Sequence, residues 1–394
     1  VTGVQTCALP ILTESALLAA IDRVYRRTGE IVGLAEELGA ELGDTTAEFT
    51  AALGLSPGLE DAPVVKLLQT MFEDAVQVRA SDVHIEPQET KLHIRFRIDG
   101  LLHLQTEADS KIATALALRL KLMSGLDISE KRLPQDGRFN VKVRGNQIDV
   151  RISTMPTQYG ESVVMRLLNQ NTGLLGLDRL GFPSDMLERI RRIIARPSGM
   201  VLVTGPTGSG KTTTLYSALT ELNTPDRKII TVEDPVEYQL AGINQVQVSE
   251  AAGLSFAVAL RAMLRQAPNV VMLGEIRDLE TAGIAINASL TGHLVFSTLH
   301  TNDAPSAVQR LIDIGIKPFL VASACRGLMA QRLVRKICKG CAAPHMPTEE
   351  QFKALELDPA SITGANYSRG AGCTDCNKKG FRGRAGIFEI FVVE

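Results

Sequence analysis

Hydrophobic and polar residues alternate strictly along two stretches in the first half of the chain, residues 92–98 and 139–152. Successive side chains of a β-strand point to opposite faces, so this period of two predicts strands with one buried face. Asp99-Gly100 follows the first stretch and Gly145-Asn146 interrupts the second. Pairs of this kind connect the strands of hairpins, so two β-hairpins are predicted.

Apolar residues recur at helical spacing in the segments before and between these hairpins, which predicts helices at 31–42, from Pro63 onward and at 112–123. Ser56-Pro57-Gly58 breaks the pattern between the first two helices and predicts a linker. Residues 12–58 are therefore expected to hold the remnant of an N-terminal helical region and a linker. Residues 59–172 are expected to form a small α+β domain.

The pattern changes in the second half of the chain, where short, wholly apolar runs alternate with helical segments. Strands buried on both faces have this composition, and they occur in mostly parallel sheets that helices cover on both sides. Residues 173–332 are therefore predicted to form an α/β domain with a mostly parallel sheet. Its predicted strands are Val201–Thr204, Ile229–Val232, Val270–Leu273 and Leu294–Thr298.

Composition fits a protein with more than one core. The chain has 394 residues, of which 45% are apolar, and a formal net charge of -2. This near-neutral charge disfavours a protein that coats nucleic acid or membranes through general electrostatics. No apolar run is long enough for a transmembrane helix. Residues 1–11, VTGVQTCALPI, are expected to be a non-native, adapter-derived segment, and both natural termini are expected to be missing.

Gly205 to Thr212 match the pattern GxxxxGK[ST] directly after an apolar run. Glycines let consecutive backbone N–H groups close around phosphate oxygens, and the N-terminus of the following helix adds partial positive charge. Lys211 is expected to reach the β and γ phosphates, and the Thr212 hydroxyl to bind Mg²⁺. The predicted nucleotide-binding residues are Gly205, Pro206, Thr207, Gly208, Ser209, Gly210, Lys211, Thr212 and Thr213.

Two carboxylates follow predicted strands in positions where a P-loop hydrolase needs them. Glu275 follows Gly274 after one strand, and Glu233 ends another. Glu275 is predicted to orient the attacking water and Glu233 to assist at the metal. His293 and His300 bracket a third apolar strand, where they could sense the γ phosphate, although ordinary surface histidines are the alternative interpretation.

Four of the six cysteines form two CxxC pairs, Cys338 with Cys341 and Cys373 with Cys376. Paired cysteines in a chain without a secretion signal hold a metal more often than they form disulfides. Cys325 stands alone in what looks like an apolar helical stretch and is predicted to be a small core residue.

Four segments resemble, in order and spacing, the Walker A, Asp, Walker B and His boxes of the ATPases that power type II secretion and type IV pilus assembly. They are GPTGSGKTTTLY, ITVEDPVEY, LRQAPNVVMLGEIRD and TGHLVFSTLHTNDA. The resemblance extends upstream through ASDVHIEP, RFRIDG and EKRLPQDGR, and covers residues 60–390. One departure is Pro268-Asn269, where the family usually has Pro-Asp, which puts a role for that carboxylate in doubt.

The resemblance implies a RecA-like P-loop core, preceded by a PAS-like α+β domain and followed by a C-terminal region, residues 333–394, with a tetracysteine zinc insert. Four thiolates without a histidine suit a structural zinc site, with redox chemistry as the weaker alternative. Family members are homohexameric, cytoplasmic enzymes that use ATP, Mg²⁺ and Zn²⁺ at the inner membrane. Their expected partners are an inner-membrane platform protein and a membrane-docking protein, with membrane association only through these partners and no nucleic acid.

Basic residues of the α+β domain suggest a further role. Arg97, Arg132 and Arg138 are expected to reach the nucleotide phosphates across a domain or subunit boundary, as arginine fingers do. A solvated basic face is the simpler interpretation of the same residues.

Two other functions stay open on the sequence. One is a regulatory subunit that binds nucleotide without cycling, which the two intact carboxylates disfavour. The other is a nucleic-acid motor of the RecA or helicase type, which needs a strongly basic channel that the near-neutral charge does not favour. The sequence does not distinguish a secretion pseudopilus from a pilus.

Overall fold

The computed structural model describes residues 28–41, 63–169, 175–358, 364 and 366–393. Two compact units divide the chain: Val1–Asn171 with Ile337–Arg382, and Thr172–Lys336 with Gly383–Glu394. The expected adapter-derived segment 1–11 and the linker at 56–58 lie outside the described residues. Within the described ranges, no helix is both long and apolar enough to span a bilayer.

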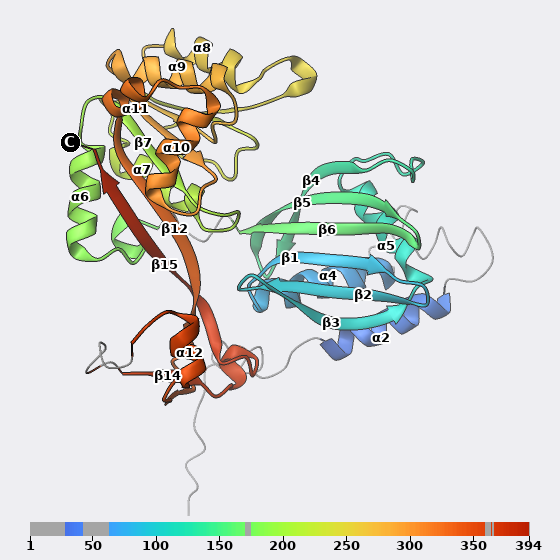
Figure 1. The fold of residues 1–394 in the computed structure, drawn as a ribbon. Coiled ribbons are helices and arrows are strands. Elements are labelled where there is room, and N and C mark those ends of the chain that lie inside the picture. The colour runs from blue at the N-terminus through green and yellow to red at the C-terminus, as the bar shows by residue number, and fades with distance from the viewer. Residues whose placement is uncertain (1–27, 42–62, 170–174, 359–363, 365, 394) are drawn as a thin grey trace, which may run out of the picture. The chain divides into compact units, whose positions relative to one another are not determined.

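The first unit contains a six-stranded antiparallel sheet in the order β3-β2-β1-β6-β5-β4 (Figure 1). Both predicted hairpins are confirmed, as β2 with β3 and β4 with β5. The strands are β1 (Ala80–Pro87), β2 (Lys91–Ile98), β3 (Leu101–Asp109), β4 (Gln135–Val143), β5 (Asn146–Thr157) and β6 (Gly160–Asn169).

Both hairpin turns require residues with positive φ, a backbone conformation that most residue types rarely adopt. Asp99 and Gly100 both have positive φ, 50° and 89°, as expected for a two-residue hairpin turn. The second turn lies one residue earlier than predicted, because Arg144 and Gly145 carry the positive φ values, 48° and 82°, and β5 begins at Asn146.

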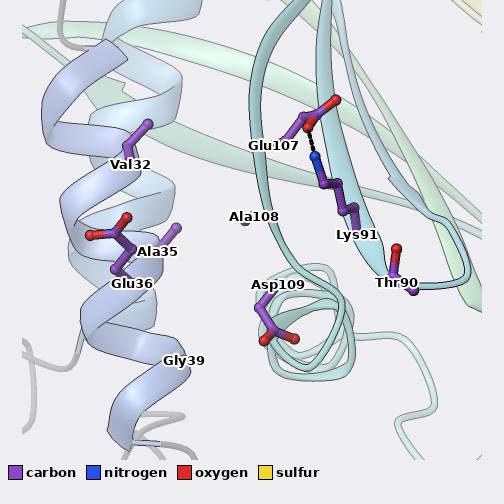
Figure 2. A pocket seen from close by; sticks show the side chains of 9 residues that line it. All are labelled: Val32, Ala35, Glu36, Gly39, Thr90, Lys91, Glu107, Ala108 and Asp109. Atoms are coloured by element: carbon purple, nitrogen blue, oxygen red, sulfur yellow. Dashed lines mark hydrogen bonds and ion pairs between the residues drawn. The ribbon is translucent and has the colours of Figure 1, made fainter.

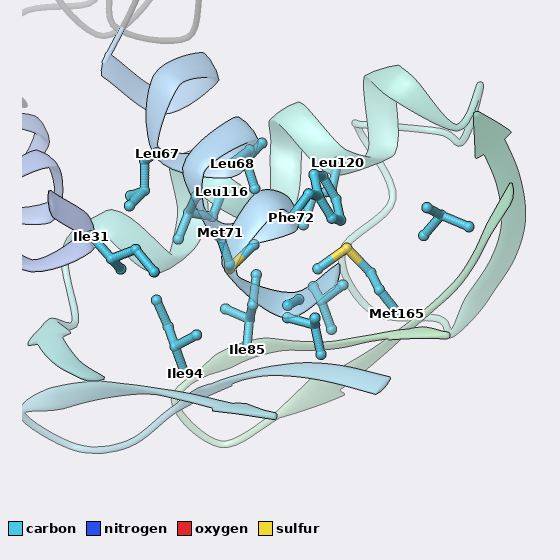
Figure 3. Close-up of a cluster of buried hydrophobic side chains, with 14 of the residues drawn as sticks. Ile31, Leu67, Leu68, Met71, Phe72, Ile85, Ile94, Leu116, Leu120 and Met165 are labelled. Carbon is cyan, nitrogen blue, oxygen red and sulfur yellow. The ribbon is translucent and has the colours of Figure 1, made fainter. Parts of the chain in front are cut away.

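Three helices pack on the apolar face of this sheet: α2 (Thr28–Glu41), α4 (Pro63–Gln77) and α5 (Ile112–Met123). All three helices were predicted, but α2 was expected to belong to a separate N-terminal region, and instead it contributes Ile31 and Leu38 to this core. Figure 3 shows Phe72 and Met71 of α4 and Leu116 and Leu120 of α5 above the strand residue Ile85. Each of these five residues is at most 1% exposed. The apolar positions of strands and helices thus form one continuous core.

The second unit is built on a seven-stranded sheet in the order β15-β12-β7-β11-β10-β8-β9. The five pairings from β12 through β7, β11, β10 and β8 to β9 are parallel. All four predicted strands are confirmed, as β7 (Gly199–Thr204), β8 (Ile229–Glu233), β10 (Val270–Leu273) and β11 (Leu294–Leu299). The others are β9 (Asn244–Gln247), β12 (Cys325–Ile337) and β15 (Phe381–Val392).

Helices cover both faces of this sheet, which explains why β7, β8, β10 and β11 are buried along their whole length (Figure 1). One face packs against α6 (Ser184–Ile194) and α7 (Lys211–Leu222). The other packs against α8 (Phe256–Leu264), α9 (Leu279–Leu290), α10 (Ala304–Ile314) and α11 (Pro318–Ala324). The α/β fold class is therefore confirmed.

Cys325 is buried, as predicted, but the predicted helical setting is wrong. Helix α11 ends at Ala324, and Cys325 is the first residue of β12, which lies beside β7. An apolar stretch of this length suits a helix or a buried strand equally well, because burial on both faces removes the alternation.

Candidate functional site

The loop between β7 and α7 has the backbone geometry of a phosphate cradle. Gly205, Gly208 and Gly210 have φ values of 144°, 76° and 89°, which residues other than glycine rarely adopt. A Cβ atom at Gly205 would also collide with the backbone oxygen of Gln331. These glycines are therefore required for the loop to turn and enter α7 at Lys211, where the free N–H groups of a helix N-terminus are suited to bind an anion.

Lys211 lies over this loop, with its Nζ donating hydrogen bonds to the carbonyl oxygens of Gly205 at 2.8 Å and Pro206 at 3.3 Å. Burial lowers the pKa of its ammonium group, and the nearby Glu275 carboxylate acts in the opposite direction. The positive charge of Lys211 is thus placed between the phosphate loop and a carboxylate.

Glu275 lies just beyond the carboxyl end of β10, after Gly274. The guanidinium Nη2 of Arg277 donates to its Oε1 at 2.6 Å, and Oε2 lies 3.6 Å from Nε2 of His300. The hydrogen bond from Arg277 lowers the pKa of Glu275 and outweighs the opposing effect of burial. Glu275 is therefore ionised at neutral pH.

His300 follows β11 and is brought to the same place as Lys211 and Glu275. Burial lowers its pKa, the charge of Lys211 lowers it further, and Glu275 opposes both effects. A lowered pKa leaves the imidazole neutral at physiological pH, so one ring nitrogen donates a hydrogen bond and the other accepts one.

Two threonines that the sequence did not single out hold His300 beside the phosphate loop. The backbone N–H of Thr301 donates to Oγ1 of Thr204 at 2.7 Å, and the two hydroxyl oxygens lie 2.8 Å apart. Thr204 is the last residue of β7, directly before the loop, so this contact joins the ends of β7 and β11. Their spacing in the sequence gives no local signal of this contact.

His293 lies at the other edge of the sheet. It precedes β11, its carbonyl oxygen accepts from the backbone N–H of Gly199 at the start of β7, and its Nδ1 lies 3.0 Å from the oxygen of Ala288. The length of β11 separates it from His300 by about 20 Å. The structure brings His300, but not His293, to the phosphate loop of the same chain.

Glu233 ends β8 and is 3% exposed. Its Oε1 accepts hydrogen bonds from Thr231 Oγ1 at 2.6 Å and Gln245 Nε2 at 3.2 Å, and its Oε2 accepts from the hydroxyl of Tyr216. Burial raises the pKa of Tyr216, and Glu233 raises it further, so the phenol stays protonated and donates. The Glu233 carboxylate thus points into the packing between β8 and α7.

We expect Tyr216→Phe to lower the free energy of unfolding by about 1–3 kcal/mol, because it removes a donor from a buried carboxylate. Urea denaturation followed by circular dichroism measures this change. Tyr159→Phe is the matched control, since Tyr159 is 45% exposed, and should change stability by less than about 0.5 kcal/mol. Equal effects of the two variants would contradict the assigned role of Tyr216.

The three predicted arginine fingers lie in the first unit. Arg97 donates to the oxygen of Gly100 at 3.1 Å, with its Nε 3.5 Å from Asp82. Arg132 pairs with Glu130 at 3.2 Å and its side chain is 89% exposed. Arg138 is exposed on β4. Both Arg97 and Arg132 are thus held by groups of their own unit, and a role at the nucleotide stays a prediction.

The departure at Asn269 lies away from the phosphate loop. Asn269 precedes β10, and its Oδ1 accepts a hydrogen bond from the backbone N–H of Lys228 at 2.8 Å. A neutral amide oxygen accepts this hydrogen bond, next to the start of β8, as well as a carboxylate oxygen does. The change from Asp to Asn therefore leaves the arrangement around Glu275 intact.

The four CxxC cysteines form one cluster. Their sulfur atoms all lie within 4.8 Å of one another, and the pairs Cys338–Cys373, Cys341–Cys376 and Cys373–Cys376 are each 3.8 Å apart. Four sulfurs bound to zinc at about 2.3 Å lie about 3.8 Å apart in a tetrahedron, so the spacing fits the metal. Backbone N–H groups of Gly372 and Gly380 also point at Sγ atoms, which favours thiolates.

A hollow of about 490 Å³ lies between α2 and the edge formed by β2 and β3 (Figure 2). Its charged lining residues are Glu36, Lys91, Glu107 and Asp109. Lys91 pairs with Glu107 and lowers the pKa of that carboxyl group. None of the predicted site residues lines this hollow.

Comparison with known proteins identifies the family to which the chain belongs. Residues 58–394 match the family described as Type II/IV secretion system protein. Type II secretion system ATPase E of Vibrio cholerae is 47% identical over 390 residues, which cover 97% of this chain and 76% of the relative. Type IV pilus assembly ATPase PilB of Myxococcus xanthus is 47% identical over 386 residues, covering 96% and 68%.

Solved structures show the same architecture. The pilus retraction motor PilT with bound ADP is 28% identical, with a TM-score of 0.55 and 83% of both chains covered. The ATPase DotB of Legionella pneumophila, with a TM-score of 0.61 over 84% of this chain and 81% of that one, shares the fold at 24% identity. The chain belongs to the Type II/IV secretion system protein family, and it is a P-loop ATPase of that family.

Proposed function

We propose that this chain hydrolyses ATP with Mg²⁺ to drive the assembly of a type IV pilus or a type II secretion pseudopilus. The observation that carries this proposal is the grouping of Lys211, Glu275 and His300 around the phosphate loop. All three follow neighbouring parallel strands, whose carboxyl ends form the usual ligand edge of such a sheet.

The residues have complementary roles in the proposed reaction. Backbone N–H groups of the loop and the ammonium of Lys211 would bind the β and γ phosphates, and the Thr212 hydroxyl would help to hold Mg²⁺. Bound Mg²⁺ would neutralise the charge that develops on the phosphates. The Glu275 carboxylate orients the attacking water, and neutral His300 donates a hydrogen bond to the γ phosphate.

Glu233 supports the site from behind. Its buried carboxylate ties β8 to α7, the helix that begins with Lys211, through Tyr216. Through this bond Glu233 would assist at the metal indirectly, by fixing the helix that carries Thr212. We therefore keep Glu233 as an assisting residue near the metal, with Glu275 as the group that contacts water.

The four cysteines are proposed to hold a structural zinc ion. The cluster has four sulfur ligands and no open position, so the metal would stabilise the fold locally and take no part in hydrolysis. Among the described residues between 338 and 382, Phe352 is the one buried apolar side chain apart from the cysteines Cys338 and Cys376. Small segments of this kind depend on a metal for their folded state.

We propose that the motor is a cytoplasmic homohexamer at the inner membrane. We expect it to act on a platform protein of that membrane and to be anchored through a docking protein, as the resemblance to secretion and pilus ATPases implies. The exposed arginines Arg132 and Arg138 are candidates to reach a nucleotide held by a neighbouring subunit. Mass photometry with and without ATP and Mg²⁺ tests the hexamer.

A phosphate-release assay under multiple turnover tests the central proposal. Repeated turnover that depends on Mg²⁺ and is indifferent to added DNA supports a secretion-type motor. A single turnover per chain would instead indicate a non-cycling regulatory subunit. Strong stimulation by DNA would indicate a nucleic-acid motor.

The pH dependence of kcat is a second test. Because Arg277 lowers the pKa of Glu275, the carboxylate stays ionised at acidic pH where an ordinary glutamate is already protonated, and turnover should be lost only at still more acidic pH. Arg277→Ala removes this effect, so the acidic loss of kcat should move to higher pH. An unchanged profile in a folded Arg277→Ala variant would contradict the link between Glu275 and catalysis.

A further inference from the structure

The side chain of Gln331 is held against the back of the phosphate loop. Gln331 lies in β12, one residue beyond Ala330, which pairs with Thr204 at the end of β7. It is 3% exposed, although β12 becomes exposed from the next residue, Arg332. A buried amide at this point needs hydrogen-bond partners, and both of its ends have one.

Both partners of this amide belong to the loop and its helix. Nε2 of Gln331 donates to the backbone oxygen of Ser209 at 2.6 Å, and Oε1 accepts from Oγ1 of Thr214 at 2.8 Å. Ser209 lies inside the loop, and Thr214 lies in the first turn of α7. One side chain therefore joins the loop to the helix that follows it.

Gln331 also limits the space behind the loop. A Cβ atom at Gly205 would collide with the Gln331 backbone oxygen, and one at Gly210 would lie 3.0 Å from Nε2. Gly205 and Gly210 are the first and last residues of the loop. Its backbone therefore lies against Gln331 at both ends, with no room for a side chain.

This arrangement bears on phosphate binding. A phosphate loop binds through N–H groups that point inward, so some of its carbonyl groups must point outward. A buried carbonyl without a donor is costly, and the loop would relax toward other conformations to satisfy it. Gln331 supplies that donor to Ser209 and is itself held by Thr214.

We infer that Gln331 is a positioning residue that holds the phosphate loop in its nucleotide-binding conformation, a role which rests on the nucleotide site proposed above. In this role Gln331 acts through its hydrogen bonds to Ser209 and Thr214. The expected signature is weaker nucleotide binding, because the loop of a variant must be ordered when nucleotide binds. Turnover at saturating ATP is expected to change less.

The test compares the full chain with Gln331→Met, which keeps the length of the side chain and removes both hydrogen bonds. Binding of a fluorescent ATP analogue with Mg²⁺ gives Kd, and steady-state hydrolysis gives KM and kcat. We expect Kd and KM to rise about tenfold, equivalent to about 1.4 kcal/mol, with kcat within about threefold. Thermal melting selects a temperature at which every variant is folded. Gln309→Met, an exposed glutamine on α10, is the matched control and should match the unchanged protein.

Thr214 supplies an independent arm. Thr214→Ser keeps the hydroxyl and should bind nucleotide normally, whereas Thr214→Val should weaken binding. In the Gln331→Met background, Thr214→Val should weaken nucleotide binding little further, because the hydrogen bond between Thr214 and Gln331 is already absent. Full additivity of the two changes, or a folded Gln331→Met variant with a Kd within twofold of the unchanged protein, would overturn the inference. Absence of binding by the unchanged protein would instead refute the nucleotide site itself.

Discussion

Glu275→Gln is expected to lower kcat for ATP hydrolysis at least about 100-fold while nucleotide binding is retained. Glutamine has nearly the same shape as glutamate, but it has no negative charge and cannot accept a proton from water. Lys211 and the loop amides stay in place, so the phosphates are still held. Phosphate release measures kcat, and the fluorescent ATP analogue measures Kd.

The control for this change is Glu280→Gln, the same substitution on the exposed surface of α9, where Glu280 pairs with Arg261. It should leave kcat within about twofold, because exposed ion pairs contribute little. Lys211→Ala should differ from Glu275→Gln by abolishing binding as well as turnover. Retained turnover in a folded Glu275→Gln variant would remove Glu275 from the mechanism.

The sequence was most informative where local chemistry dictates structure. The glycines of the phosphate loop, the apolar strands around it and the two CxxC pairs each have few alternative explanations. Strands β7, β8, β10 and β11 were predicted because a sheet covered on both faces leaves an unbroken apolar run. Glu275 and His300 were singled out as candidate site residues because they follow such runs, and the structure brings them together beside Lys211.

The central strands of the first unit, β1 and β6, were not predicted. In β1 the alternation rests on only two large apolar residues, Val83 and Ile85, and the polar residues Asp82 and His84 beside them are buried as well. Asp82 is held by ion pairs with Arg97 of β2 and Arg166 of β6. Such partners lie on other strands, so their contribution is visible only after the sheet has formed.

Contacts between distant segments set the limits of the prediction for the site. Gln331 and Ser209 are 122 residues apart, and nothing near Gln331 in the sequence indicates a phosphate loop. The sequence alone could have shown that His293 lies far from the phosphate loop. A residue that precedes a parallel strand lies at the edge of the sheet opposite the carboxyl ends of the strands, where ligands bind. Glu233 could not be assigned a direction from the sequence. A residue at the end of a strand can point either toward a ligand or into the interior, and Glu233 points into the interior.

Removing two sulfur ligands is expected to abolish zinc binding and unfold the cysteine segment. The paired change Cys373→Ser with Cys376→Ser leaves Cys338 and Cys341, and two thiolates do not close a tetrahedral site. The unchanged protein should contain about one zinc ion per chain by elemental analysis, and the variant should contain almost none. Limited proteolysis should then cut within residues 338–380.

The control for this change is Cys325→Ala. Cys325 lies in the core at the start of β12, and burial raises the pKa of its thiol to about 12, so it is a protonated core side chain rather than a ligand. That variant should keep its zinc, even if it is somewhat less stable. Because the zinc is proposed to take no part in hydrolysis, the paired variant should lose zinc and protease resistance while it still binds the fluorescent ATP analogue. Zinc content that is equal in all three proteins would contradict the metal site. Disulfide bonds do not explain the cluster instead, because its sulfur atoms lie 3.8 Å apart, well beyond the length of an S–S bond.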